Sequence, residues 1–120
     1  MTVPKTFDTE SVGKTLVVRP LDCVGSLAGA SLKAEMEGLL EQLRESGLRS
    51  VVIDLHRLPY FGTNLLEAMH MIWRPVRAQG GKMFLCNVSD VGREILRVSR
   101  FDTLWPIFAS EEEALEETAE

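Results

Sequence analysis

The spacing of apolar residues changes several times along the chain. The run TLVVRPL, from Thr15 to Leu21, is typical of a strand, and Lys5 to Ser11 is expected to pair with it in a hairpin that turns near Gly13. From about Ser26, apolar residues recur at intervals of three and four, which predicts a helix. Gly47 is the predicted stop of that helix.

After Gly47 the pattern alternates between short apolar runs and helical spacing. The runs predict strands at residues 51–55, 83–88 and 104–108. Between them, helical spacing predicts one helix that ends before Gly80-Gly81 and another that is capped by Ser89-Asp90. A last helix is expected after Ser110, with Glu113 at the spacing of a capping box.

The predicted order is β-β-α-β-α-β-α-β-α, in which strands and helices alternate after the first hairpin. Such alternation indicates an α/β domain with a mixed, mostly parallel sheet and about four helices packed against it. At 120 residues the chain is long enough for one core and no more, so residues 1–120 are expected to form a single domain.

Charge is distributed unevenly along the chain. The formal net charge is −5, but the last ten residues hold six Glu and no Lys or Arg. The rest of the chain has 13 basic against 12 acidic residues and is nearly neutral. The acidic segment, about residues 110–120, is expected to be a capped helix that frays into solvent. A net negative chain is a poor binder of phosphate backbones, so no nucleic-acid partner is expected.

Signatures of catalysis and of cofactor or metal binding are absent from the sequence. Cys23 and Cys86 lack CxxC spacing and are expected to be small buried hydrophobes. His56 and His70 have no ligand-like neighbours and are expected at the surface or its boundary. An enzyme is therefore not expected, although Cys86 would be the best candidate for a catalytic nucleophile.

The compartment and surface charge follow from the same reading. No signal peptide and no apolar run of membrane-spanning length is present, so we expect a cytoplasmic protein without membrane insertion. Arg93, Arg97 and Arg100 follow i, i+4, i+7 spacing on the third predicted helix. They form either a basic stripe for an acidic partner or, as we favour, an ordinary solvated face.

The segment VVIDLHRLPYFGTNLL, residues 51–66, consists of a buried strand, a loop and a helix start. It resembles the central segment of the STAS family of bacterial anti-sigma factor antagonists, in which a strand ending in Asp-Leu leads to an Asp-Ser-Ser-Gly-Leu turn. Residues 76–96 (VRAQGGKMFLCNVSDVGREIL) and 101–115 (FDTLWPIFASEEEAL) are similar to later runs of that family. The resemblance covers nearly the whole chain.

The resemblance implies a regulatory module that acts by partner switching. The family's phosphoacceptor falls on Thr63, which keeps a hydroxyl. The flanking residues depart from the family, because its Asp falls on Gly62, its second Ser on Asn64 and its Gly on Leu65. The phosphorylation turn is thus interpreted as degenerate.

Two roles for this turn remain open. Thr63 is either a phosphorylated switch or, with Asn64 and Glu67 as an N-x-x-E capping box, part of a helix cap. Residues expected to bind a partner are the following: Asp22, Gly25, Ser26, Tyr60, Phe61, Gly62, Thr63 and Asn64. For Tyr60 and Phe61, packing beneath the loop is the alternative.

The implied partner is an anti-sigma factor or a related kinase. The alternative function, also implied by the family, is a non-switching STAS subunit of a larger assembly such as a lipid-transport ATPase complex. A homodimer is a further assembly that the sequence leaves open.

Overall fold

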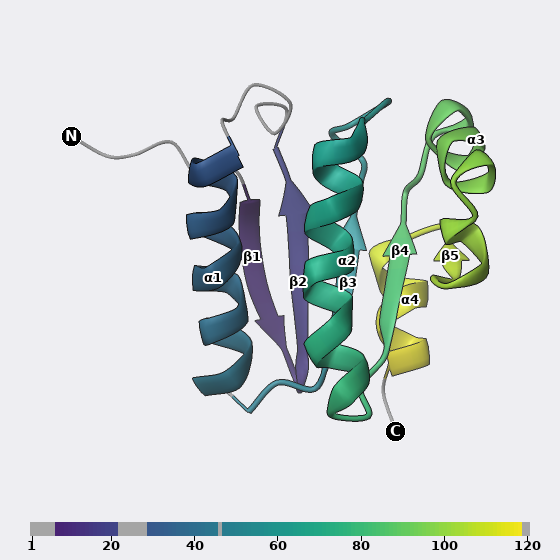
Figure 1. Ribbon diagram of the computed structural model, residues 1–120. Helices are drawn as coiled ribbons and strands as arrows, with labels where there is room; N and C mark the ends of the chain where they lie inside the picture. The colour runs from purple at the N-terminus through teal and green to yellow at the C-terminus, as the bar shows by residue number, and fades with distance from the viewer. Residues whose placement is uncertain (1–6, 22–28, 46, 119–120) are drawn as a thin grey trace.

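The computed structural model describes residues 7–21, 29–45 and 47–118, which form a five-stranded sheet with the order β1-β2-β3-β4-β5 (Figure 1). β1 (Phe7–Val12) and β2 (Thr15–Pro20) are antiparallel and are joined by a turn at Gly13, whose φ is +59°. β3 (Ser50–Asp54), β4 (Met83–Cys86) and β5 (Ile107–Phe108) continue the sheet in parallel.

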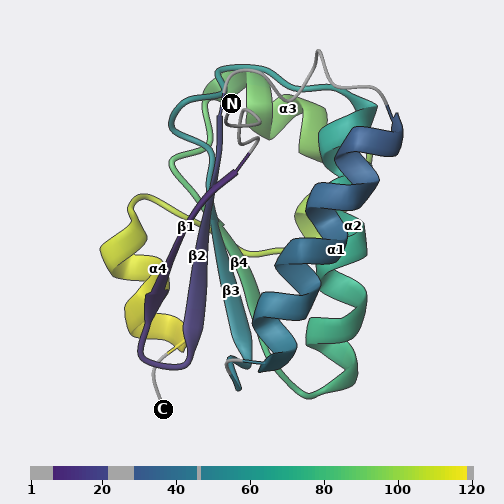
Figure 2. The same ribbon diagram turned by 90° about the vertical axis from the view of Figure 1, so that its left-hand side faces the viewer.

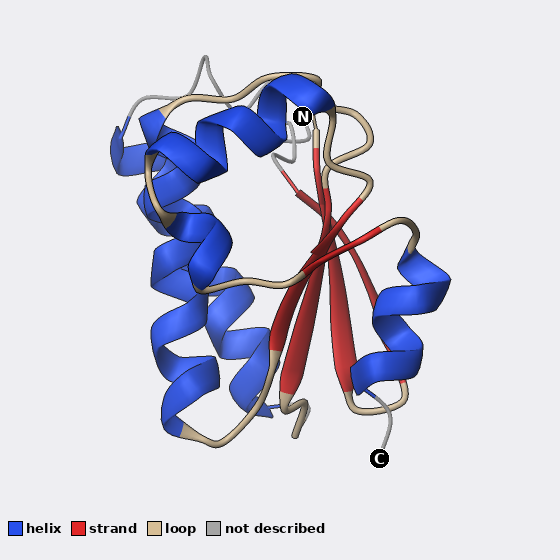
Figure 3. Cartoon of the chain, turned by 90° about the vertical axis from the view of Figure 1, so that its right-hand side faces the viewer, coloured by secondary structure: helices blue, strands red, loops and turns tan. Residues whose placement is uncertain are grey.

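Two long helices and two short ones cover the sheet. α1 (Gly29–Glu45), α2 (Thr63–Ala78) and α3 (Asp90–Val98) lie on one face, and α4 (Glu111–Thr118) lies on the other (Figures 2 and 3). A 3₁₀ turn, Phe101–Thr103, follows α3. The predicted α/β class, mixed mostly parallel sheet and four α-helices are confirmed. None of the helices in these ranges is long and apolar enough to span a membrane.

Residues of β3 alternate between the two faces, as a pleated strand requires. Val51 and Ile53 are buried in the large core beneath α1, α2 and α3. Val52 is buried in a smaller cluster on the α4 side. Asp54 follows at the next position of that second face and is 3% exposed.

α4 is part of the folded domain, and the expectation that its segment frays into solvent is wrong. Ala114 is 0% exposed and packs in one cluster with Val17, Val52 and Cys86. Near the end of the helix, Thr15 donates a hydrogen bond to the Thr118 hydroxyl at 3.0 Å. The helix holds five Glu, yet its few small and apolar residues are sufficient to cover the second face.

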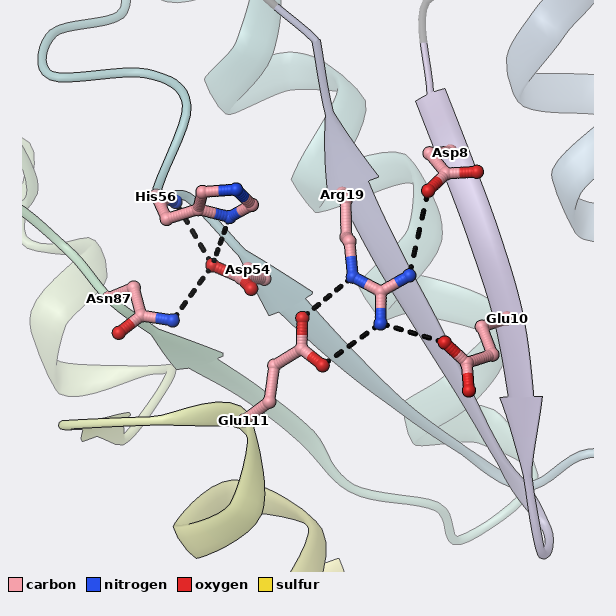
Figure 4. Close-up of polar contacts among 7 residues, drawn as sticks. All are labelled: Asp8, Glu10, Arg19, Asp54, His56, Asn87 and Glu111. Atoms are coloured by element: carbon pink, nitrogen blue, oxygen red, sulfur yellow. Dashed lines mark hydrogen bonds and ion pairs between the residues drawn. The ribbon is translucent and has the colours of Figure 1, made fainter.

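An ion-pair cluster attaches the start of α4 to the hairpin. The Arg19 guanidinium donates to both carboxylate oxygens of Glu111, at 2.7 and 3.0 Å (Figure 4). It also pairs with Glu10 at 2.8 Å and Asp8 at 3.5 Å on β1. Glu111, and after it Glu10, raise the pKa of Arg19 above its usual range. The acidic charge of α4 is thus partly neutralised by a residue 92 positions earlier in the chain.

Two predicted boundaries changed and one cap was confirmed. The last strand has only residues 107–108, because Leu104 follows the 3₁₀ turn and Trp105 is buried in the large core. β4 ends at Cys86, since Asn87 adopts a φ of +55°. At α4, the Ser110 hydroxyl accepts from the Glu113 N–H at 3.2 Å, as the capping spacing predicted.

Loops leave the parallel strands at two opposite edges of the sheet (Figure 1). At the carboxyl edge, β3 leads to α2 and β4 leads to α3. At the amino edge lie the hairpin turn, the α1–β3 loop and the α2–β4 loop. In open α/β sheets functional groups gather at the carboxyl edge, which is where the predicted site falls.

Candidate functional site

The loop between β3 and α2, residues 55–62, is fixed by buried apolar residues. Leu55, Leu58 and Phe61 are all buried in the large core. The Leu55 N–H donates to Cys86 on the neighbouring strand at 3.0 Å, and the Leu58 N–H donates to Leu55 at 3.0 Å. Tyr60 lies between these anchors and is 73% exposed. The loop therefore presents one aromatic side chain to solvent from a well-supported backbone.

α3 supports this loop from the side. The Ser89 hydroxyl accepts a hydrogen bond from the Gly92 N–H at 2.9 Å, which caps α3 as the sequence predicted, and donates to the Pro59 carbonyl. Gly92 is buried against the Phe61 ring, because a Cβ at Gly92 would lie 3.1 Å from that ring. This close approach positions the end of the loop just before α2 begins.

α2 begins at Thr63, with Gly62 as its N-cap residue in an extended conformation. Gly62 has no side chain that could cap this end, and the first turn contains no acidic residue. A capping box on Asn64 and Glu67 would need the helix to begin after Asn64, whereas the helix begins at Thr63. A helix start of this kind has uncompensated N–H dipoles, which favour a negative charge placed beside them.

A polar cluster holds the ends of β3 and β4 beneath the loop (Figure 4). The Asp54 carboxylate accepts from the Asn87 side-chain amide and from the His56 N–H, each at 3.0 Å. The His56 ring nitrogen Nδ1 lies 3.1 Å from the same oxygen. Burial alone would raise the pKa of Asp54, but the hydrogen bonds donated by Asn87 and His56 favour the carboxylate and hold the pKa below its ordinary value. Asp54 is thus an ionised structural anchor.

Residues 7–114 match the model of the STAS domain. The chain belongs to the STAS family.

Relatives of known description support this assignment. Over 92 residues, 77% of this chain and 79% of the relative, the STAS chain is 27% identical to "Putative anti-sigma factor antagonist BtrV" of Bordetella bronchiseptica. An anti-sigma-factor antagonist (STAS) domain protein from Planctomyces limnophilus has a TM-score of 0.79 at 23% identity, covering 95% of this chain and 98% of that one.

A third similar protein has been solved in two states. SpoIIAA in its unphosphorylated form has a TM-score of 0.76 at 18% identity, covering 92% of this chain and 94% of that one. The phosphorylated form of the Bacillus protein has a TM-score of 0.68 at 19% identity, with coverage of 94% and 99%. At these identities the structures show a shared fold. The chain is an anti-sigma factor antagonist-like STAS protein, a class of regulatory proteins and not enzymes.

The STAS structure brings together some of the residues expected to bind a partner. Tyr60 and Phe61 have opposite environments, since Tyr60 is exposed and Phe61 is buried, so only Tyr60 is available as an anchor. Gly62, Thr63 and Asn64 lie together at the helix start. Three further predicted residues, Asp22, Gly25 and Ser26, lie outside the described residues.

The two cysteines were expected to be small buried hydrophobes. Cys86 is buried as expected, and burial together with the Asp54 and Glu111 carboxylates raises its pKa to about 12. At neutral pH almost none of such a thiol is in the thiolate form, so Cys86 is a poor candidate for a catalytic nucleophile. Cys23 lies outside the described residues.

The three arginines at positions 93, 97 and 100 do not form the continuous basic stripe that was the less favoured alternative. α3 ends at Val98, so Arg100 lies beyond the helix with a φ of +65°. Arg97 forms an ion pair with Glu94, and Arg93 is exposed. Of the histidines, His56 is 47% exposed at its side chain, and His70 is half-buried against Trp73 and Phe101.

Sequence reasoning missed the residues that support the site. Asp54, Asn87 and Ser89 hold the loop, but the first two are 33 positions apart and pair only because β3 and β4 are neighbours. A signal was present, since each is a short polar residue in or directly after the last two positions of a predicted apolar strand. Parallel strands end at one edge, so such residues are candidates for mutual contact.

Proposed function

We infer that this STAS protein is an anti-sigma factor antagonist that binds its partner through the carboxyl edge of the sheet. The contact surface consists of the exposed Tyr60 and the start of α2, residues 62–64. Phosphorylation of Thr63 by an anti-sigma kinase would release the partner. The inference rests first on the position of Thr63 as the first residue of a 16-residue helix whose N-cap residue is Gly62.

The helix start suits a phosphorylated residue. A phosphate adds about −1.5 to −2 charges and three acceptor oxygens. The first turn of α2 contains no carboxylate that would repel this charge, and Gly62 occupies the position of the family's Asp. The uncompensated N–H groups and the helix dipole therefore stabilise the phosphorylated state.

Release follows from the place where the charge appears. The helix start directly follows a loop whose backbone is fixed and whose Tyr60 is 73% exposed. Exposed aromatic residues supply much of the affinity at protein interfaces. A dianion beside such an anchor must be desolvated when a partner covers it, which opposes binding. One modification would thus lower affinity without unfolding the domain.

A second chain segment leaves the sheet at the same edge. β2 pairs in parallel with β3, so Leu21 at the end of β2 and Leu55 at the end of β3 start loops on one side. We include Asp22, Gly25 and Ser26 in the proposed contact surface for this reason and because of the family resemblance. The names of the relatives, all anti-sigma factor antagonists, agree with a partner of the anti-sigma class.

Phosphosite mapping tests the switch. The protein is incubated with its cognate anti-sigma kinase and ATP, and phosphate is located by mass spectrometry. Modification is expected at Thr63 and absent in Thr63→Ala. Ser11→Ala, which removes an exposed hydroxyl at the amino end of the sheet, is the matched control and should leave the phosphate unchanged. Phosphate at another residue, or none, would contradict the proposal.

Binding of the unmodified protein tests the surface. Tyr60→Ala is expected to weaken binding of the anti-sigma factor about tenfold or more. Val12→Ala removes a partly exposed apolar side chain at the hairpin and should leave affinity unchanged. Co-purification from native cells of a transport ATPase in place of a kinase would contradict this function and support the non-switching subunit.

A further inference from the structure

A pocket of about 440 Å³ opens at the amino edge of the sheet, away from the start of α2. The β1–β2 turn, the α1–β3 loop and the α2–β4 loop line it, together with the last turn of α4. Each of the three loops contributes one cationic residue, namely Lys14, Arg49 and Lys82, and no carboxylate is among the lining residues. In Figure 1 these loops lie together at the lower end of the molecule, beside the end of α4.

Backbone hydrogen bonds tie the three loops together. The Arg49 and Ser50 N–H groups donate to the Lys14 carbonyl at 2.9 and 3.3 Å. The Lys82 N–H donates to the Ser50 hydroxyl at 3.0 Å, and the Gln79 amide donates to the Arg49 carbonyl at 3.1 Å. The positions from which the three cationic side chains leave the backbone are therefore fixed before any ligand binds.

Two glycines make this arrangement sterically feasible. A Cβ at Gly81 would lie 1.7 Å from the Arg49 carbonyl oxygen, so only glycine permits the contact. Gly80 has a φ of +79°, and a Cβ there would lie 3.2 Å from the Arg49 guanidinium. The Gly80-Gly81 pair, which sequence analysis took only as a helix stop, thus allows the Arg49 loop to approach the pocket wall.

The charges in the pocket are not neutralised by the described part of the chain. Lys14, Arg49 and Lys82 are exposed and form no ion pair with any carboxylate in residues 7–21, 29–45 and 47–118. Arg49 and Lys82 donate only to backbone carbonyls there, those of Gln79 and Glu117, each at 3.3 Å. A guanidinium has five donors and an ammonium three, so both retain donors for a ligand.

We propose that this amino-edge pocket binds a small molecule through a phosphate group. Three cations around one cavity match the charge and the acceptor oxygens of a phosphate better than those of a single carboxylate. The volume falls in the range of small-molecule sites and exceeds the needs of a bare ion. The pocket and the start of α2 lie at opposite edges, so the ligand and the partner protein can bind together.

Calorimetric titration with inorganic pyrophosphate at low salt tests the pocket, with amide NMR signals of Gly80 and Gly81 as local reporters. Saturable binding that shifts these signals and weakens with added salt is expected. Arg49→Gln and Lys82→Gln should each weaken binding about tenfold. Arg93→Gln, the same charge change on α3, is the matched control and should bind as the parent protein does.

Circular dichroism of each variant ensures that a loss of binding is not a loss of fold. The proposal would be overturned by undetectable binding at millimolar pyrophosphate. It would also be overturned if a variant with Lys14, Arg49 and Lys82 all replaced by Gln bound as tightly as the parent protein. The two sources of a phosphate group are separated by two further probes, glycerol phosphate in solution and vesicles containing phosphatidylglycerol. If glycerol phosphate competes with pyrophosphate, the ligand is a soluble molecule. If the vesicles compete, the ligand is a lipid headgroup.

Discussion

Adjacent residues of β3 meet different environments on the two faces of the sheet. Val51 and Val52 are the same residue type and both are 0% exposed. Among the described residues, Val51 packs beneath α1 and α2 in a core of 22 buried residues. Val52 packs beneath the eight-residue α4 in a cluster of four buried residues, itself included. On the first face apolar burial dominates. On the second, a thin apolar layer lies beside two sets of polar contacts, that of Arg19 with Glu111 and that of Asp54 with Asn87 (Figure 4).

This difference shows that full burial of a side chain does not imply equal support around it. A large core loses many contacts when one side chain shrinks, and the surrounding helices cannot move to fill the space. A single short helix can settle into a small gap at lower cost. We therefore expect α4 to be the first element to open, with its attachment dependent on ion pairs.

The largest predicted effect comes from truncating the two valines. Val51→Ala is expected to lower the free energy of unfolding by about 2–3 kcal/mol, and Val52→Ala by about 1–2 kcal/mol. Urea denaturation followed by the fluorescence of Trp73 and the buried Trp105 measures both. Equal losses of unfolding free energy would mean that α4 supports its face of the sheet as well as α1 and α2 support the other face.

A smaller effect is predicted for the ion pair at the start of α4. In a Cys23→Ser background, Glu111→Gln removes the charged partner of Arg19 and should weaken the attachment of α4 by about 1 kcal/mol. Opening of α4 exposes Cys86, so thiol labelling should quicken about fivefold.

The neighbouring substitution Glu112→Gln provides the control, because Glu112 is exposed and does not contact Arg19. High salt should quicken labelling in the parent protein and have less effect in Glu111→Gln. Identical labelling of both variants would show that the ion pair does not hold the helix.

The smallest predicted effect is a pH dependence from Asp54. Because its pKa in the folded protein is lowered, its ionised form adds stability above the unfolded pKa of about 3.9, and this is lost as pH falls through the folded value. The difference in free energy of unfolding between the parent protein and Asp54→Asn should therefore become smaller below about pH 4. Asp8→Asn is the matched substitution on the same face. If this difference from the parent protein shrinks equally for both variants, the assignment to Asp54 is contradicted.

The first face was predictable from the sequence because its signals are local. Helical spacing of Met36, Leu39 and Leu43, and the β-branched run of β3, give the elements and their buried sides without long-range information. The crossovers between parallel strands then place α1, α2 and α3. The Ser89 and Ser110 caps were predictable for the same reason, since a cap contacts residues only three positions away.

The second face was not predictable because its contacts are distant in the sequence. α4 contains five Glu and a narrow apolar side, so its local pattern indicates a solvated helix. Its attachment depends on Arg19, 92 residues away, and on Thr15, 103 residues from Thr118. At the site, the sequence placed Thr63 at the helix start but could not separate the buried Phe61 from the exposed Tyr60, since both are aromatic and adjacent.

The central claim is that phosphorylation of Thr63 switches partner binding at the start of α2. The most direct test is the dissociation constant of the anti-sigma factor for the same STAS preparation before phosphorylation, after it, and after phosphatase treatment. We predict that phosphorylation weakens binding at least tenfold and that the phosphatase restores it. Equal dissociation constants in the phosphorylated and unphosphorylated states would contradict the account.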